Sequence, residues 1–106
     1  MNVNQYNINQ KQIYIIPVEH NKDSPYAKIG INNIREAMKN LKPTSFKLWI
    51  YFAKNQSNYR MFLSCVDACN FCNFSKNTFH SAVKDLIDAG YLKRTNENYF
   101  TFSEEI

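Results

Sequence analysis

The clearest pattern of apolar and polar positions lies in the last third of the chain. Apolar side chains recur there every three or four residues and leave a polar face opposite, which predicts an amphipathic helix from Lys76 to Ala89. Ser75 can cap its first turn, and Gly90 follows where helices commonly end in a left-handed residue. The apolar stripe comprises Phe79, Ala82, Val83, Leu86 and Ile87.

Two helices are predicted in the middle of the chain. The first covers residues 32–41, where apolar residues recur at helical spacing, and Pro43 breaks it. The second starts near Thr44 or Ser45, either of which can cap it, and runs to about Lys54. It is apolar on nearly all sides, so we expect it in the centre of the core.

Directly before the amphipathic helix, the sequence predicts a short helix and a tight turn. The short helix covers residues 65–72 and can be capped by Ser64. Cys69 is small enough for a close crossing of the two helices, and Asn73 tolerates the positive φ that such a turn needs. Phe74 then supplies an apolar side chain to the core.

β-Branched and aromatic residues predict four short strands. They cover residues 12–18, 60–63, 91–95 and 99–103. Because Pro17 cannot donate a hydrogen bond to a sheet, the first strand should lie at an edge or end there. The last two should form a hairpin joined by residues 96–98, with Phe100 and Phe102 facing the core.

The length of 106 residues indicates one domain. Residues 1–11 are polar and rich in Asn and Gln, so we interpret them as a flexible arm. Residues 12–106 are then a single domain with its core between residues 31 and 103, and residues 19–26 are a loop.

Three segments resemble winged helix-turn-helix DNA-binding proteins. Residues 73–79 (NFSKNTF) resemble their G-[IV]-S-x-x-T-[VFY] turn, and residues 85–92 (DLIDAGYL) resemble the helix ending that precedes their wing. Residues 43–49 (PTSFKLW) are similar to a first helix that is common in small phage and plasmid proteins of Gram-positive bacteria. Asn73 replaces the usual Gly, and Cys69 replaces the usual Ala.

The resemblance implies an α+β fold that is mostly α. It is a winged helix-turn-helix with three to four helices and a small antiparallel sheet that ends in a β-hairpin wing. In such proteins the N-terminal half of the second helix of the motif enters the major groove. Its expected contacts here are Lys76, Asn77, His80, Ser81 and Lys84. The wing would add Lys93, Arg94 and Asn96.

The charge of the chain agrees with a polyanionic partner. The net charge is +4, and because Glu104 and Glu105 supply two acidic residues at the C-terminus, the remainder carries +6. The N-terminus has no secretion signal, and the longest apolar run, residues 48–53, is too short to span a bilayer. We therefore expect a cytoplasmic protein with no membrane partner.

Cys65, Cys69 and Cys72 have the spacing C-x3-C-x2-C. Three thiolates could hold an iron–sulfur cluster, or His80 could complete a zinc site, but small core residues are the favoured interpretation. No metal and no cofactor are expected. With two glycines the chain has no Gly-rich phosphate loop, and His20 and His80 lack nucleophile or carboxylate partners, so an enzyme is not expected.

The sequence thus predicts a sequence-specific binder of double-stranded DNA from a mobile element. It would act as a transcription regulator or as an accessory factor at a plasmid origin of transfer, replication or partition. A homodimer is expected, with the strand at residues 12–18 as its contact. The alternative is a protein-interaction module or inhibitor that uses a winged-helix fold without DNA binding.

Overall fold

The computed structural model describes residues 3–4, 13–19, 23–55, 63–96 and 99–106 and shows an α+β chain that is mostly helical. Its helices are α1 (Ile31–Asn40), α2 (Pro43–Ala53), α3 (Cys65–Cys72) and α4 (Lys76–Ala89). Its strands are β1 (Val3–Asn4), β2 (Ile13–Tyr14), β3 (Leu92–Asn96) and β4 (Tyr99–Phe102). They form two separate two-stranded antiparallel sheets, β1–β2 and β3–β4.

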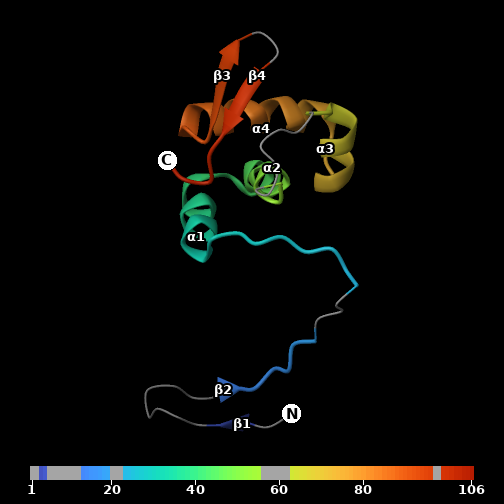
Figure 1. Cartoon of the computed structure of the whole chain (residues 1–106), viewed down its shortest axis with the longest axis vertical. Helices are drawn as coiled ribbons and strands as arrows, with labels where there is room; N and C mark the ends of the chain where they lie inside the picture. Colours follow the sequence, from blue (N-terminus) through green and yellow to red (C-terminus); the bar gives the residue numbers. More distant parts are fainter. Residues whose placement is uncertain (1–2, 5–12, 20–22, 56–62, 97–98) are drawn as a thin grey trace.

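Helix α2 lies in the centre of the helical body, with α1, α3 and α4 packed around it (Figure 1). Its side chains are buried on several sides, which confirms the expectation from its apolar sequence. The buried positions of α2 are Ser45, Leu48, Trp49, Tyr51, Phe52 and Ala53. The cap predicted at Thr44 or Ser45 is wrong, because the N-cap residue is Lys42, which makes no side-chain cap, and the helix begins at Pro43. Pro43, with its fixed φ and absent N–H, fits the first helical position.

The indole of Trp49 joins α2 to the C-terminal hairpin. Trp49 is completely buried and stacks on Phe46 with ring centroids 5.7 Å apart. Tyr91 and Phe102 meet it edge-on, at 6.4 Å and 6.2 Å. Such edge-on contacts are favourable for aromatic rings beyond the area they bury. Phe100 and Phe102 both pack against the core, which confirms the predicted orientation of the hairpin.

The predicted caps and turn between α3 and α4 are confirmed. The side chain of Ser64 accepts a hydrogen bond from the Asp67 amide, and that of Ser75 accepts one from the Thr78 amide, each at 3.2 Å. Asn73 has φ 55° and ψ 55°, in the left-handed region. The three residues 73–75 therefore suffice to join the two helices.

Gly90 also has the expected left-handed conformation, with φ 95°, and it ends α4. The packing of α3 differs in detail from the expectation. The most deeply buried small side chain of α3 is that of Ala68, which is completely buried, whereas Cys69 is half-buried beside Cys65. The small residue at the centre of the buried face of α3 is therefore Ala68, one residue before the predicted Cys69.

The N-terminal strand is shorter than predicted. Of residues 12–18, only Ile13 and Tyr14 form a strand, and they pair with Asn4 and Val3, which the sequence had placed in a flexible arm. Residues 15–19 are exposed and outside any strand. The register pairs Ile13 with Asn4 and Tyr14 with Val3, so the two-residue β1 sets the length of the described ladder. This segment leads away from the helical body (Figure 1).

Two of the predicted strand regions lie partly outside the described residues. Leu63 is not in a strand, and the rest of the strand expected at residues 60–63 lies outside the described residues. The hairpin β3–β4 is present, with an irregular register between Arg94 and Asn96, and residues 97–98 of its link lie outside the described residues. Within the described parts of the chain, no helix combines the length and apolar character needed to cross a bilayer.

Asn73 provides a direct test of this turn. We expect Asn73→Ala to lower the free energy of unfolding by about 1 kcal/mol, because alanine pays the steric penalty of the left-handed region without the local hydrogen bonding that helps asparagine. Asn73→Gly should equal or exceed the wild-type stability. Urea denaturation of the three proteins measures this difference, and equal stability of the alanine variant would contradict the assigned turn.

Candidate nucleic-acid interface

Helix α4 presents one polar face to solvent and buries the other. On the buried side, Phe79, Ala82 and Leu86 belong to the core. On the opposite side all five side chains predicted from the sequence are exposed. They are Lys76, Asn77, His80, Ser81 and Lys84. The helix is thus anchored along its apolar stripe and leaves its polar face accessible over its first nine residues.

Helical periodicity divides this polar face into two parallel rows. Lys76, His80 and Lys84 follow one another at intervals of four residues and carry the basic groups. Asn77 and Ser81 form the neighbouring row, which offers amide and hydroxyl groups. A face of this composition can attract phosphates with one row and form hydrogen bonds with the other.

The hairpin adds two exposed cations beside α4. Helix α4 packs against β3, which carries Lys93 and Arg94, and both side chains are exposed. The Arg94 guanidinium lies 4.7 Å from the centre of the Phe100 ring, an arrangement that orients the cation without burying it. The backbone of Asn96 pairs with Tyr99 at the end of β3, and its side chain lies outside what the structure describes.

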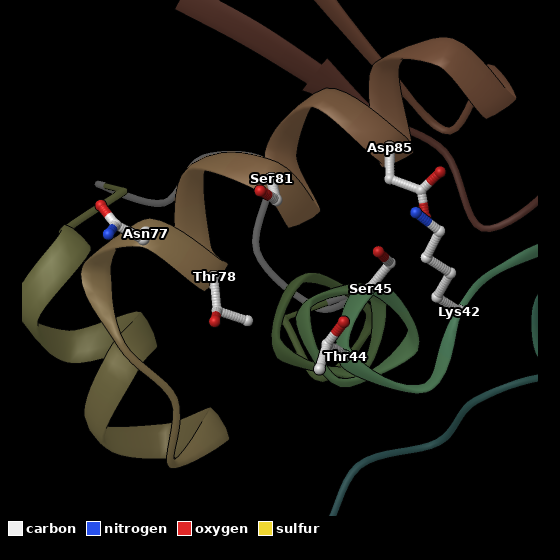
Figure 2. A pocket seen from close by; sticks show the side chains of 7 residues that line it. All are labelled: Lys42, Thr44, Ser45, Asn77, Thr78, Ser81 and Asp85. Carbon is white, nitrogen blue, oxygen red and sulfur yellow. The ribbon is translucent and has the colours of Figure 1, made fainter.

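A polar hollow of about 290 Å³ lies between the first turn of α2 and the Asn77–Ser81 row of α4 (Figure 2). Sequence reasoning identified Asn77 and Ser81 but missed the other members. The full lining is Lys42, Thr44, Ser45, Asn77, Thr78, Ser81 and Asp85. The signal that could have found the hollow is the run of polar residues at the start of an otherwise apolar α2. In sequence, the same run is typical of a helix cap.

The hollow contains an unpaired carboxylate oxygen. Asp85 is half-buried, and its Oδ2 atom is buried without a hydrogen-bond partner. Lys42 and Asp85 extend toward one another from α2 and α4 (Figure 2). Asp85 therefore belongs to the inner wall of the hollow.

The cysteines on α3 do not form an evident metal centre. The Sγ atoms of Cys65 and Cys69 are 3.9 Å apart, and Cys72 is buried. Burial raises the pKa of Cys69, and its contact with Cys65 raises it further. Among the residues that the structure describes, no three or more His, Cys, Asp or Glu side chains are grouped to hold a metal ion.

A polar contact also joins α2 to α3. The Tyr51 hydroxyl donates a hydrogen bond to Asp67 Oδ2 at 2.6 Å. Burial and this hydrogen bond raise the pKa of Tyr51, so the phenol stays protonated at neutral pH. The Lys54 ammonium lies 4.9 Å from the centre of the Tyr51 ring and 5.1 Å from that of Phe71. This cluster holds α3 in place and thereby positions the turn that leads into α4.

Comparisons of the chain with family models, with curated proteins and with solved structures found no match.

Cys72 provides a pH-dependent test of the core between α2 and α3. Burial raises its pKa to about 11, with smaller opposing effects of the Lys47 and Lys54 charges. Because the thiolate is the reactive form, labelling of Cys72 by iodoacetamide at pH 8 should be slower in the native protein than in the protein unfolded in guanidinium.

The native labelling rate should rise roughly tenfold per pH unit between pH 8 and 10, since the thiolate fraction rises in that proportion below the pKa. Peptide mapping by mass spectrometry reports each cysteine separately. Equal rates at Cys72 in the native and unfolded proteins would contradict the burial of this side chain.

Proposed function

We propose that this chain is a winged helix-turn-helix protein that binds double-stranded DNA in a sequence-specific manner. The observation that carries the proposal is the exposed basic and amide face of α4, which stands beside two exposed cations on the β3–β4 hairpin. The element order of three core helices followed by a hairpin supports it, as does the resemblance of residues 73–79 to the turn of that fold.

In this proposal α4 is the recognition helix and lies in the major groove. Asn77 can pair with an adenine edge through its amide, while Lys76 and Lys84 reach guanine or phosphate groups. His80 and Ser81 complete the contact row between them. The β3–β4 hairpin is the wing, and its Lys93, Arg94 and Asn96 meet the backbone beside the groove.

The biological role follows from the resemblance to small phage and plasmid proteins. We propose a cytoplasmic protein of a mobile element that regulates transcription or assists at a plasmid origin of transfer, replication or partition. No chemical step is assigned to it, because binding is sufficient for each of these roles.

Charge removal tests the DNA surface. Selection from random-sequence duplexes should yield a bound site, and Lys84→Ala and Arg94→Ala should each weaken binding to that site. Each should also reduce the salt dependence, the slope of log K against log salt, by about one if it removes one phosphate contact. Lys39→Ala is the matched control, because Lys39 is an exposed lysine on α1 and α2 lies between α1 and α4 (Figure 1).

Fluorescence anisotropy at several salt concentrations measures both quantities. If both variants keep the wild-type affinity and salt slope, the assignment of α4 and the hairpin to the DNA interface is contradicted. Failure to select any duplex at micromolar protein would overturn the function itself.

We also propose a homodimer that forms through the N-terminal segment. Tyr14, Ile15, Ile16 and Val18 are 50%, 46%, 68% and 88% exposed, and they follow one another along residues 13–19. Consecutive exposed apolar side chains of this kind are typical of an interaction site. A second copy would place two recognition helices on one duplex, which raises both affinity and specificity.

The dimer has a simple test. Ile15→Ser combined with Ile16→Ser should convert a dimer into a monomer, because the apolar area that stabilises the contact is lost. Analytical ultracentrifugation of both proteins at 10–100 µM, which is roughly the range for a modest interface, gives the oligomeric state. A monomeric wild-type protein would contradict the dimer, and so would a dimer that survives the double substitution.

The same apolar segment favours the second candidate function. A protein-interaction module or inhibitor would use residues 14–18 to contact a different protein and would leave α4 without a partner. Failure to select a duplex, together with an unchanged oligomeric state in the double variant, supports this function over DNA binding.

A further inference from the structure

We propose that the hollow between α2 and α4 seats a phosphate group of the DNA backbone. This inference rests on the proposed DNA-binding function, and it adds a contact surface that the sequence did not indicate. The lining draws on two elements, the first turn of α2 and the Asn77–Ser81 row of α4 (Figure 2). A volume of about 290 Å³ can hold a phosphate together with several water molecules at ~30 Å³ each.

The first turn of α2 supplies hydrogen-bond donors that the protein leaves unused. Its N-cap residue Lys42 makes no side-chain cap, and no acidic residue lies in the first turn. The first amide with a helical partner is that of Phe46, which donates to the Lys42 carbonyl at 2.8 Å. Within the described residues, the amides of Thr44 and Ser45 donate no hydrogen bond. Free amides at a helix N-terminus, together with the helix dipole, favour an anion.

Ser45 provides an independent indication of a ligand. It is 2% exposed and is the only polar residue that the described part of the chain buries so deeply. Within the described part of the chain, its hydroxyl has no hydrogen-bond partner, and its oxygen is not one of the fully enclosed unpaired atoms. The side chain lines the hollow and rises from α2 toward α4 (Figure 2). The Ser45 hydroxyl therefore opens on the hollow, where it can donate a hydrogen bond to a ligand.

The charges around the hollow determine which anion fits. Lys42 is the cation of the lining and Asp85 is its acid, and the two side chains point toward one another (Figure 2). The negative charge of Asp85 therefore repels a free anion and lowers the affinity of the hollow for it. A DNA phosphate overcomes this opposition because the neighbouring row of Lys76, His80 and Lys84 holds the duplex against the same helix.

The position of the hollow agrees with this assignment. Asn77 and Ser81 belong both to the exposed face of α4 and to the wall of the hollow. Helical periodicity places Lys76, His80 and Lys84 on the next row of the same face. A duplex that lies along this face therefore brings one strand of its backbone past the first turn of α2.

Three variants and one control test the proposed phosphate site in the hollow, called the seat below. All are measured with the duplex selected for the wild-type protein. Lys42→Ala should weaken binding about three- to tenfold and reduce the salt slope by about one. Ser45→Ala should weaken binding about threefold without lowering the free energy of unfolding, because the hydroxyl has no partner within the protein. Asp85→Asn should strengthen binding, since it removes a repulsive charge.

Lys47→Ala is the matched control, because Lys47 is an exposed lysine of α2 that does not line the hollow. It should bind as the wild type does. Wild-type affinity and slope in Lys42→Ala and Ser45→Ala, with weakened binding in Lys84→Ala, would overturn the seat and leave the DNA-binding function intact. Weaker binding by Asp85→Asn would contradict the seat as well.

A second measurement keeps the seat testable if no duplex is bound. Inorganic phosphate titrated into the 15N-labelled wild-type protein should shift the amide resonances of Thr44 and Ser45, and Lys42→Ala should reduce those shifts. Such shifts without duplex binding would retain a phosphate site while the DNA-binding function fails. An absence of shifts at both amides, together with an absence of duplex binding, would overturn the seat.

Discussion

The packing of aromatic side chains around Trp49 is the constraint on which the rest of this structure depends. The indole is completely buried between Phe46 of the same helix and two rings of the C-terminal part, Tyr91 and Phe102. Phe102 also stacks on Phe52 with centroids 5.2 Å apart. These contacts hold the hairpin and the end of α4 against α2, so one apolar stripe of α4 is sufficient to anchor it. The opposite face is thereby left exposed to solvent.

The same packing places the hollow next to the exposed polar face of α4. Because α4 crosses α2 near the first turn of that helix, polar residues of both helices line one space, while the apolar residues beyond them fill the core. The caps at Ser64 and Ser75 and the left-handed Asn73 fix the start of α4, and the Tyr51–Asp67 hydrogen bond fixes α3 before it. The parts that fix the helices therefore lie beneath the proposed contacts, and the contacts themselves are polar side chains.

The sequence predicted the helical part of the fold closely, because its signals are local. Ser64, Asn73, Ser75 and Gly90 each have a conformational role that does not depend on distant residues, so α3 and α4 begin and end where expected. The N-terminal strand was predicted too long, because strand length depends on a partner and the described partner of Ile13–Tyr14 is the two-residue β1. Propensity alone does not report that partner.

The candidate site was predicted in part for a similar reason. The exposed row on α4 follows from helical periodicity, since a polar face opposite a core stripe is expected to meet solvent. The hollow does not follow from it, because Ser45 and Asp85 are 40 residues apart in sequence and meet only through the crossing of α2 and α4. Ser45 looked like a cap, and its deep burial without a partner is visible only in three dimensions.

The most direct test of the central claim is a map of the surface that DNA covers. Amide chemical shifts of the 15N-labelled protein, recorded with and without a selected duplex, report that surface residue by residue. We expect the largest changes in residues 76–84 and in β3, with smaller ones at the first turn of α2. Changes confined to α1 or to residues 13–19, with α4 unaffected, would contradict the central claim.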